Sequence, residues 1–256
     1  MNQGDDGMIV LKSAREIENM KAAGKLLASV HKELRKLIKP GVTTWEIDQF
    51  VEDYLKKHGA TPQQKGYRNY QYATCASIND EVCHGFPRRE VLNDGDIVTI
   101  DMVVNLNGAL ADSAWSYAVG NINEQSQRLL EVTKEALYRG IAASVPGNRV
   151  GDIGHAIQSY VEGEGFSVVR EFIGHGIGSV IHEKPDIPHY GLPGKGPRLK
   201  EGMVFTIEPM VNVGEWKTKM DDNGWTARTV DGKLSAQYEH TIAITKDGPV
   251  ILTEQD

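Results

Sequence analysis

Gly95-Asp-Ile-Val-Thr-Ile-Asp101-Met-Val-Val-Asn105 has the pattern of a buried strand, and it recurs 107 residues later as Gly202-Met-Val-Phe-Thr-Ile-Glu208-Pro-Met-Val-Asn212. Five of the eleven positions are identical. A second match has an offset of 106 residues, and its first copy is Pro40-Gly41 with Ile47, Tyr54 and Gly59. The second copy is Pro146-Gly147 with Ile153, Tyr160 and Gly165. Two matches at nearly one offset favour two similar halves, related by a pseudo-twofold axis, over a chance likeness.

Helix signals precede the strand pattern in each half. Capping boxes at Ser13–Glu16 and Thr43–Glu46 predict two helices, which end at Pro40-Gly41 and Gly59. Apolar residues at helical spacing predict two more helices, over 124–143 and about 153–162. Strand-like runs lie at 73–78, 97–104, 109–119, 167–173, 203–212 and 238–244. We therefore expect an α+β fold in which helices flank a largely antiparallel sheet.

The composition excludes several classes of protein. Over 256 residues the net charge is −7, which leaves no basic excess for phosphates, so we expect no direct sequence-specific nucleic-acid binding. No apolar run is long enough to cross a bilayer, and the polar residues 1–8 are a predicted disordered tail, not a secretory signal. Cys75 and Cys83 are predicted free thiols, which favours a reducing, cytoplasmic location without a membrane partner.

Acidic residues interrupt the apolar strand patterns. Asp101 and Glu208 occupy equivalent positions of the repeated stretch, and Asp112 and Glu239 lie on two other strand-like runs. A buried carboxylate must meet a cation, because its desolvation costs several kcal/mol. Neither repeated strand offers an arginine or lysine at a suitable spacing. A salt bridge remains an alternative for each acid alone, but less so for all four together.

Two histidines, His175 and His182, lie seven residues apart, and the first stands between glycines in Gly174-His-Gly176. Four carboxylates converging with one imidazole would suit two divalent ions better than one. Such a donor set favours Mn²⁺, Fe²⁺ or Co²⁺ and also accepts Zn²⁺, and the residues do not decide which ion is physiological. The run between the two histidines is predicted to be extended, so His182 need not reach the same ion.

The chain resembles a type I methionine aminopeptidase of the pita-bread fold, which prolidase and aminopeptidase P share. The motifs that carry the resemblance are Ser77-Ile-Asn-Asp-Glu-Val-Cys-His84-Gly-Phe-Pro87, Gly95–Asp101, Gly174–Gly178, His182-Glu-Lys-Pro185, Thr206–Gly214 and Ala236-Gln-Tyr-Glu239-His-Thr-Ile242. The resemblance covers nearly the whole chain. It implies a single catalytic domain over 9–256, with halves at about 13–120 and 121–256.

The resemblance also implies a role for each site residue. The implied metal ligands are Asp101, Asp112, His175, Glu208 and Glu239, and Asp112 and Glu239 would bridge the two ions. Glu208 would also accept a proton from the metal-bridged water or hydroxide that attacks the substrate. His84 and His182 would be catalytic, non-ligand histidines. Both would also contact substrate, together with the pocket residues Tyr67, Tyr70, Cys75 and Trp225.

The implied activity is removal of the initiator methionine when the second residue is small. The implied partners are nascent polypeptide N-termini and, near the exit tunnel, the ribosome, and the implied state is a monomer. Three residues depart from the pattern, namely Ile181, Gln64 and Ala111, and they leave the pocket shape and turnover open. Two alternatives stay open: an Xaa-Pro peptidase, whose relatives usually carry an extra N-terminal domain, and a low-activity or non-catalytic binding paralogue.

The other histidines receive structural interpretations. His31, His58 and His155 lie on predicted helices and are expected at the surface, and His189 is expected to make a structural hydrogen bond. Cys83 and His84 are expected on opposite sides of a strand, because neighbours on a strand alternate. A thiol–imidazole pair is therefore not favoured.

Overall fold

A computed structural model describes residues 8–255, so residues 1–7 of the predicted tail lie outside the described part. Helices α1 (Ala14–Leu37), α2 (Thr44–Lys57), α3 (Glu124–Ala143) and α4 (Val150–Gly163) confirm the four predicted helices. Both predicted capping boxes are present, since Ser13 and Thr43 exchange hydrogen bonds with Glu16 and Glu46. No helix in the described range is long and apolar enough to cross a bilayer.

The first half is built on a long antiparallel hairpin. Strand β4 (Ile97–Leu106) pairs with β5 (Ala109–Ala118), and β4 also lies between β1 (Ala60–Pro62) and β2 (Cys75–Ile78). A small sheet beside it joins β3 (Glu81–Cys83), β12 (Ala227–Thr229) and β11 (Thr218–Met220). Between β1 and β2, a 3-10 turn, η1 (Tyr67–Asn69), interrupts the polar loop.

The second half contains two antiparallel sheets. The larger has the order β15 (Gly248–Ile251), β14 (His240–Thr245), β9 (Val204–Ile207), β7 (Gly174–Gly176) and β8 (Glu183–Ile187). The smaller has the order β13 (Ser235–Gln237), β10 (Met210–Asn212) and β6 (Ser167–Val168). The predicted strand at 203–212 is therefore two strands, because Glu208-Pro209 interrupts it and proline cannot donate to a ladder.

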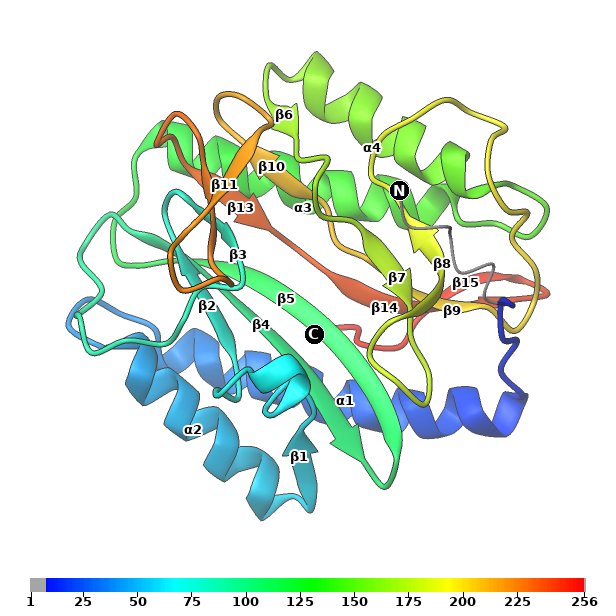
Figure 1. Ribbon diagram of the computed structural model, residues 1–256, viewed down its shortest axis with the longest axis horizontal. Helices are drawn as coiled ribbons and strands as arrows, with labels where there is room; N and C mark the ends of the chain where they lie inside the picture. Colours follow the sequence, from blue (N-terminus) through cyan, green and yellow to red (C-terminus); the bar gives the residue numbers. More distant parts are fainter. Residues whose placement is uncertain (1–7, 256) are drawn as a thin grey trace.

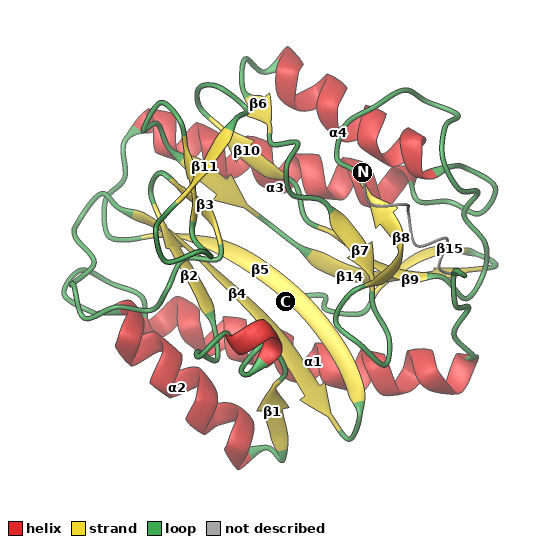
Figure 2. Ribbon diagram, viewed as in Figure 1, coloured by secondary structure: helices red, strands yellow, loops and turns green. Residues whose placement is uncertain are grey.

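The two halves repeat one order of elements, a long helix, a shorter helix and then strands. Figure 1 shows α1 and α2 on one side of the strands and α3 and α4 on the other. Figure 2 shows the strands as a curved layer between these two pairs of helices. The apolar faces of all four helices join one continuous core, which includes Leu27, Ile47, Ile100, Leu137, Ile157 and Phe205.

Strand β5 joins the halves through hydrogen bonds to Glu239, which lies between β13 and β14, and to Thr241 in β14. The Glu239 amide donates to Ala114 O over 2.8 Å, and Ser113 Oγ donates to Glu239 O over 2.9 Å. The Asp112 amide donates to Thr241 Oγ1 over 3.0 Å. Asp112 and Glu239, which are far apart in sequence, are thereby fixed side by side.

One histidine prediction is wrong. His31 on α1 is fully buried, because this face of the helix packs on β5 rather than facing solvent. Its Nδ1 lies 2.6 Å from the Tyr117 hydroxyl. The predicted structural role of His189 is confirmed, since its Nε2 accepts the Glu208 amide over 3.1 Å.

Candidate active site

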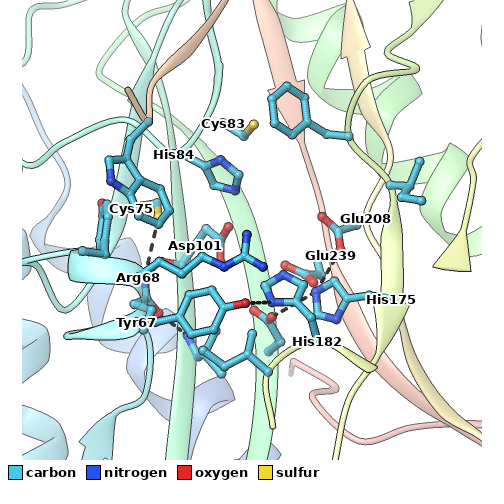
Figure 3. Close-up of a pocket in the computed structure, with 18 of the residues that line it drawn as sticks. Tyr67, Arg68, Cys75, Cys83, His84, Asp101, His175, His182, Glu208 and Glu239 are labelled. Carbon is cyan, nitrogen blue, oxygen red and sulfur yellow. Dashed lines mark hydrogen bonds and ion pairs between the residues drawn. The ribbon is translucent and has the colours of Figure 1, made fainter. Parts of the chain in front are cut away.

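A cavity of about 210 Å³ lies where the two halves meet (Figure 3). It is lined by every site residue expected from the sequence, namely Tyr67, Tyr70, Cys75, His84, Asp101, Asp112, His175, His182, Glu208, Trp225 and Glu239. Of the three departures from the family pattern, Gln64 and Ile181 line the cavity, whereas Ala111 is buried in β5 and does not. Six lining residues were not anticipated: Arg68, Cys83, Val103, Phe172, Ile173 and Met210.

The acidic floor of the cavity draws on both halves. Ligand-type atoms of Asp112, His175 and Glu239 all lie within 4.8 Å of one another. His175 Nε2 is 3.7 Å from Asp112 Oδ2 and 3.5 Å from Glu208 Oε1. Asp101, on β4, completes the four carboxylates around the cavity. The structure thus brings together all five residues that the resemblance implied as ligands.

His175 is held so that one ring nitrogen faces the acids. Its Nδ1 donates to the Gly176 carbonyl over 3.0 Å, which leaves the lone pair on Nε2. The flanking glycines are required by close approach of the backbone: a Cβ at Gly174 would lie 2.5 Å from Thr206 O, and one at Gly176 would lie 2.4 Å from Lys184 O. Imidazole fixed through the other nitrogen is the usual arrangement of a metal ligand.

Two carboxylate oxygens at the floor are left without a partner. Asp112 Oδ1 and Glu239 Oε1 are buried and accept no hydrogen bond within the described chain. Burial, followed by repulsion from neighbouring carboxylates, raises the pKa of Asp112 and of Glu239 well above the usual range. Burial also raises the pKa of Asp101 to about 7 and that of Glu208 to about 8. Buried carboxylates without hydrogen-bond donors or counter-charges fit divalent cations.

Glu208 is the most constrained of the four acids. Thr206 Oγ1 donates to its Oε1 over 2.7 Å, and Gln237 Nε2 donates to its Oε2 over 3.4 Å. The backbone N–H of Glu208 donates to His189 Nε2. Because its Oε1 also lies near His175 Nε2, the Glu208 carboxylate has a neighbour at each of its two oxygens.

Two further histidines approach the cavity from opposite walls. His182 Nδ1 is hydrogen-bonded to the Tyr67 hydroxyl over 3.1 Å. His84 packs edge-on against Phe172 and Trp225. Burial lowers the pKa of His84 to about 4. The pKa of His182 is also lowered, mainly by burial and to a smaller extent by the positive charge of Arg68. Both rings are therefore neutral at pH 7, and neither forms an ion pair in the described part of the chain.

Two local expectations are corrected here. The run from Gly178 to Ile181 is bent rather than extended, because it turns from β7 into β8, and it brings the ring centroids of His175 and His182 to 4.1 Å. Cys83 and His84 both line the cavity. The strand alternation fails there because β3 ends at Cys83 and His84 has a positive φ of 57°.

The fold and cavity agree with comparisons to known proteins. Residues 18–246 match the model of metallopeptidase family M24. The chain belongs to the M24 family. It is 54% identical to "Methionine aminopeptidase 1" of Bacillus subtilis, over 96% of this chain and 99% of that protein. It is also similar to the crystal structure of methionine aminopeptidase from Rickettsia prowazekii, with a TM-score of 0.95, 44% identity, and coverage of 96% of this chain and 100% of that one.

More distant solved structures share the fold alone. X-Pro aminopeptidase from Thermotoga maritima superposes with a TM-score of 0.76 at 22% identity, and the match covers 96% of this chain but 63% of that one. The pita-bread fold and the family predicted from the sequence motifs are thus confirmed. An M24 metallopeptidase is a metal-dependent enzyme, which the acidic floor fits.

Proposed function

We propose that this chain is a methionine aminopeptidase, which releases an N-terminal methionine from a polypeptide when the second residue is small. The observation that carries the proposal is the pair of unpartnered oxygens on Asp112 and Glu239, beside His175 Nε2 at the closed end of a cavity. The methionine aminopeptidase from Bacillus subtilis, 54% identical over nearly the full length, supports the substrate class. The Xaa-Pro alternative is not favoured, because those structures share the fold at low identity.

We propose that five residues would hold two divalent ions, and that Asp112 and Glu239 are two of these residues. Asp101, His175 and Glu208 would complete the donor set, which suits Co²⁺, Mn²⁺, Fe²⁺ or Zn²⁺. Such ions supply Lewis acidity and make water nucleophilic near neutral pH. The support is the number of inward carboxylates, which exceeds what one catalytic ion usually takes from a protein.

The chain's own residues have distinct tasks in peptide hydrolysis. Glu208, whose Oε1 lies 3.5 Å from His175 Nε2 at the acidic floor, can accept a proton and return it to the leaving amine. Neutral His84 and His182 can donate hydrogen bonds to the scissile carbonyl as negative charge develops on its oxygen. This assignment rests on their positions on the two walls and on their lowered pKa values.

The cavity walls suit an unbranched thioether. Tyr70 is 2% exposed and Cys75 is 7% exposed, and Trp225 packs edge-on against Tyr70 with centroids 5.0 Å apart. Sulfur packs favourably against aromatic edges, and a buried pocket of this size excludes bulky groups. We propose these residues, together with Tyr67, His84 and His182, as the substrate-binding set.

From the family resemblance, we further propose that the substrates are nascent chains and that the enzyme is a cytoplasmic monomer that works near the ribosomal exit tunnel. We also propose residues 9–256 as one catalytic domain. Sedimentation measures the oligomeric state, and co-sedimentation with ribosomes measures the contact.

The decisive test compares peptides on metal-loaded enzyme. We expect release of methionine from Met-Ala-Ser at least about 100-fold faster than from Met-Lys-Ser, since specificity of a few kcal/mol follows from steric exclusion. Equal turnover of the two would contradict the small-residue rule. Faster cleavage of Ala-Pro-Ala than of Met-Ala-Ser would overturn the proposal in favour of an Xaa-Pro peptidase.

A further inference from the structure

A single arginine stands at the mouth of the cavity. Among the described residues that line the cavity, Arg68 and His182 are the exposed ones, while Tyr70, Cys75, Ile181 and their neighbours are buried. The buried residues mark the closed end, so the polypeptide that follows the first residue must leave past Arg68 and His182. Figure 3 shows the Arg68 side chain reaching over the cavity from the η1 side.

Arg68 is held in place rather than free in solvent. Its guanidinium carbon lies 5.3 Å from the centre of the Tyr67 ring, and Tyr67 is itself hydrogen-bonded to His182. The loop that carries it is closed by the Gly66 amide, which donates to Tyr70 O over 2.7 Å. The guanidinium is therefore fixed by the wall that also holds His182.

The backbone at this position is unusual. Arg68 has φ 47° and ψ 36°, and Asn69 follows with φ 69°, so two successive non-glycine residues adopt the left-handed conformation. Such a conformation is uncommon for a side chain other than glycine and is found at ligand-contacting sites. In this loop, the left-handed backbone accompanies an arginine side chain that points toward the cavity.

The charge of Arg68 has no carboxylate partner between residues 8 and 255. Another exposed arginine with a stacked ring, Arg89, lies over Trp45 and does not line the cavity. The chain carries 35 acidic against 28 basic residues, and four of the acidic residues line the cavity. Arg68 is thus a cation fixed on the exit path of the substrate, in a protein of net negative charge.

We propose that Arg68 is a specificity residue that binds a carboxylate of the substrate just beyond the small second residue. This inference rests on the proposed methionine aminopeptidase function. The carboxylate has two sources, the acidic side chain of a third residue or the terminal carboxylate of a tripeptide. Guanidinium pairs with carboxylate through parallel hydrogen bonds, so both sources offer the same chemistry.

The test uses metal-loaded enzyme and four-residue peptides with amidated C-termini, Met-Ala-Glu-Gly and Met-Ala-Lys-Gly. We expect kcat/KM to be about 2- to 10-fold higher for the glutamate peptide than for the lysine peptide. The glutamate peptide would form an exposed ion pair with Arg68, whereas the lysine peptide would bring a like charge to it. The preference should appear in KM and weaken at high salt. The glutamate-to-lysine ratio of kcat/KM should fall toward one in Arg68→Gln and invert in Arg68→Glu. Comparing free Met-Ala-Ser with its amide measures the contribution of the terminal carboxylate.

Arg89→Gln is the matched control, because it removes an exposed, ring-stacked arginine outside the cavity, and it should keep the preference. An unchanged glutamate-to-lysine ratio in Arg68→Gln overturns the inference. Dissociation constants for the same peptides with a methyleneamine in place of the first amide separate binding from cleavage. Charge-selective binding without methionine release would contradict only the proposed function. Methionine release without a charge preference would contradict only the role of Arg68.

Discussion

His175 and His182 place their ring centroids 4.1 Å apart, although their nearest partners differ. His175 Nε2 faces Asp112 and Glu208, whereas His182 Nδ1 faces the Tyr67 hydroxyl. The two rings are therefore neighbours with separate tasks. One is oriented toward the acids that would hold ions, and the other toward the side from which the peptide enters.

We predict that His175→Ala weakens metal binding, whereas His182→Ala does not. His182→Ala should lower kcat by about 10²–10³ with little change in KM, because a donor to a developing oxyanion acts mainly in the transition state. Calorimetric titration with Mn²⁺ or Co²⁺ and steady-state kinetics give both readouts. If His182→Ala lost metal as His175→Ala does, this division of labour would fail.

We predict that Asp112→Ala and Glu239→Ala each abolish activity through loss of metal. Each side chain contributes a buried oxygen that accepts no hydrogen bond within the described protein, so its removal takes away a ligand atom for the ions. Metal analysis of the purified variants decides the point. Thr253→Val alters a buried hydroxyl outside the cavity and serves as the control for folding. Full occupancy in Asp112→Ala would show that the ligand assignment is wrong.

The acidic floor could be predicted because charged side chains stand in strand patterns that are otherwise apolar. Asp101 and Glu208 stand in apolar strand runs, and desolvation makes such positions informative in a single sequence. The repeat placed them in equivalent positions of two halves. Asp112 and Glu239 were found for the same reason, although Glu239 lies between β13 and β14 rather than within a strand.

The mouth of the cavity could not be predicted, because it depends on turns. Arg68 lies between two expected pocket residues, Tyr67 and Tyr70, and that position was the one available signal. Its orientation follows from left-handed backbone angles that no hydrophobic periodicity encodes. The bend at 178–181 and short strands such as β3 and β8 were missed for the same reason, since two to five residues carry too little pattern.

A buried ion pair fixes the bend that carries His182. Lys12, 5% exposed in its side chain, pairs with Glu183, 15% exposed, and its Nζ also donates to Val10 O over 3.3 Å. The lysine passes so close to Gly178 that a Cβ there would lie 2.5 Å from Lys12 Cε. The segment before α1 is thereby attached to the β7–β8 turn.

We predict that Lys12→Met lowers the free energy of unfolding by about 3 kcal/mol, because it leaves Glu183 buried without its partner. Lys36→Met is the matched control, since its pair with Glu33 is exposed and should be worth under about 1 kcal/mol. Denaturant unfolding of both variants, at one fixed metal concentration, measures the difference. Equal losses in the two variants would show that the Lys12 pair contributes no more than a surface contact.

The buried His31 makes the fold sensitive to acid. Burial lowers its pKa from 6.5 to about 3, so between these values the unfolded chain binds a proton that the folded protein does not. The stabilisation is therefore complete above pH 6.5 and is lost as the pH falls toward 3, by about 1.5 kcal/mol between pH 6.5 and 5. We predict that His31→Gln removes this part of the pH dependence, whereas His155→Gln, at an exposed position on α4, keeps it. Both are measured by denaturant unfolding of metal-free protein beside the parent, so that titration of the acidic floor cancels in the difference. A parent and a His31→Gln variant with parallel stability curves would show that folding does not lower the pKa of His31.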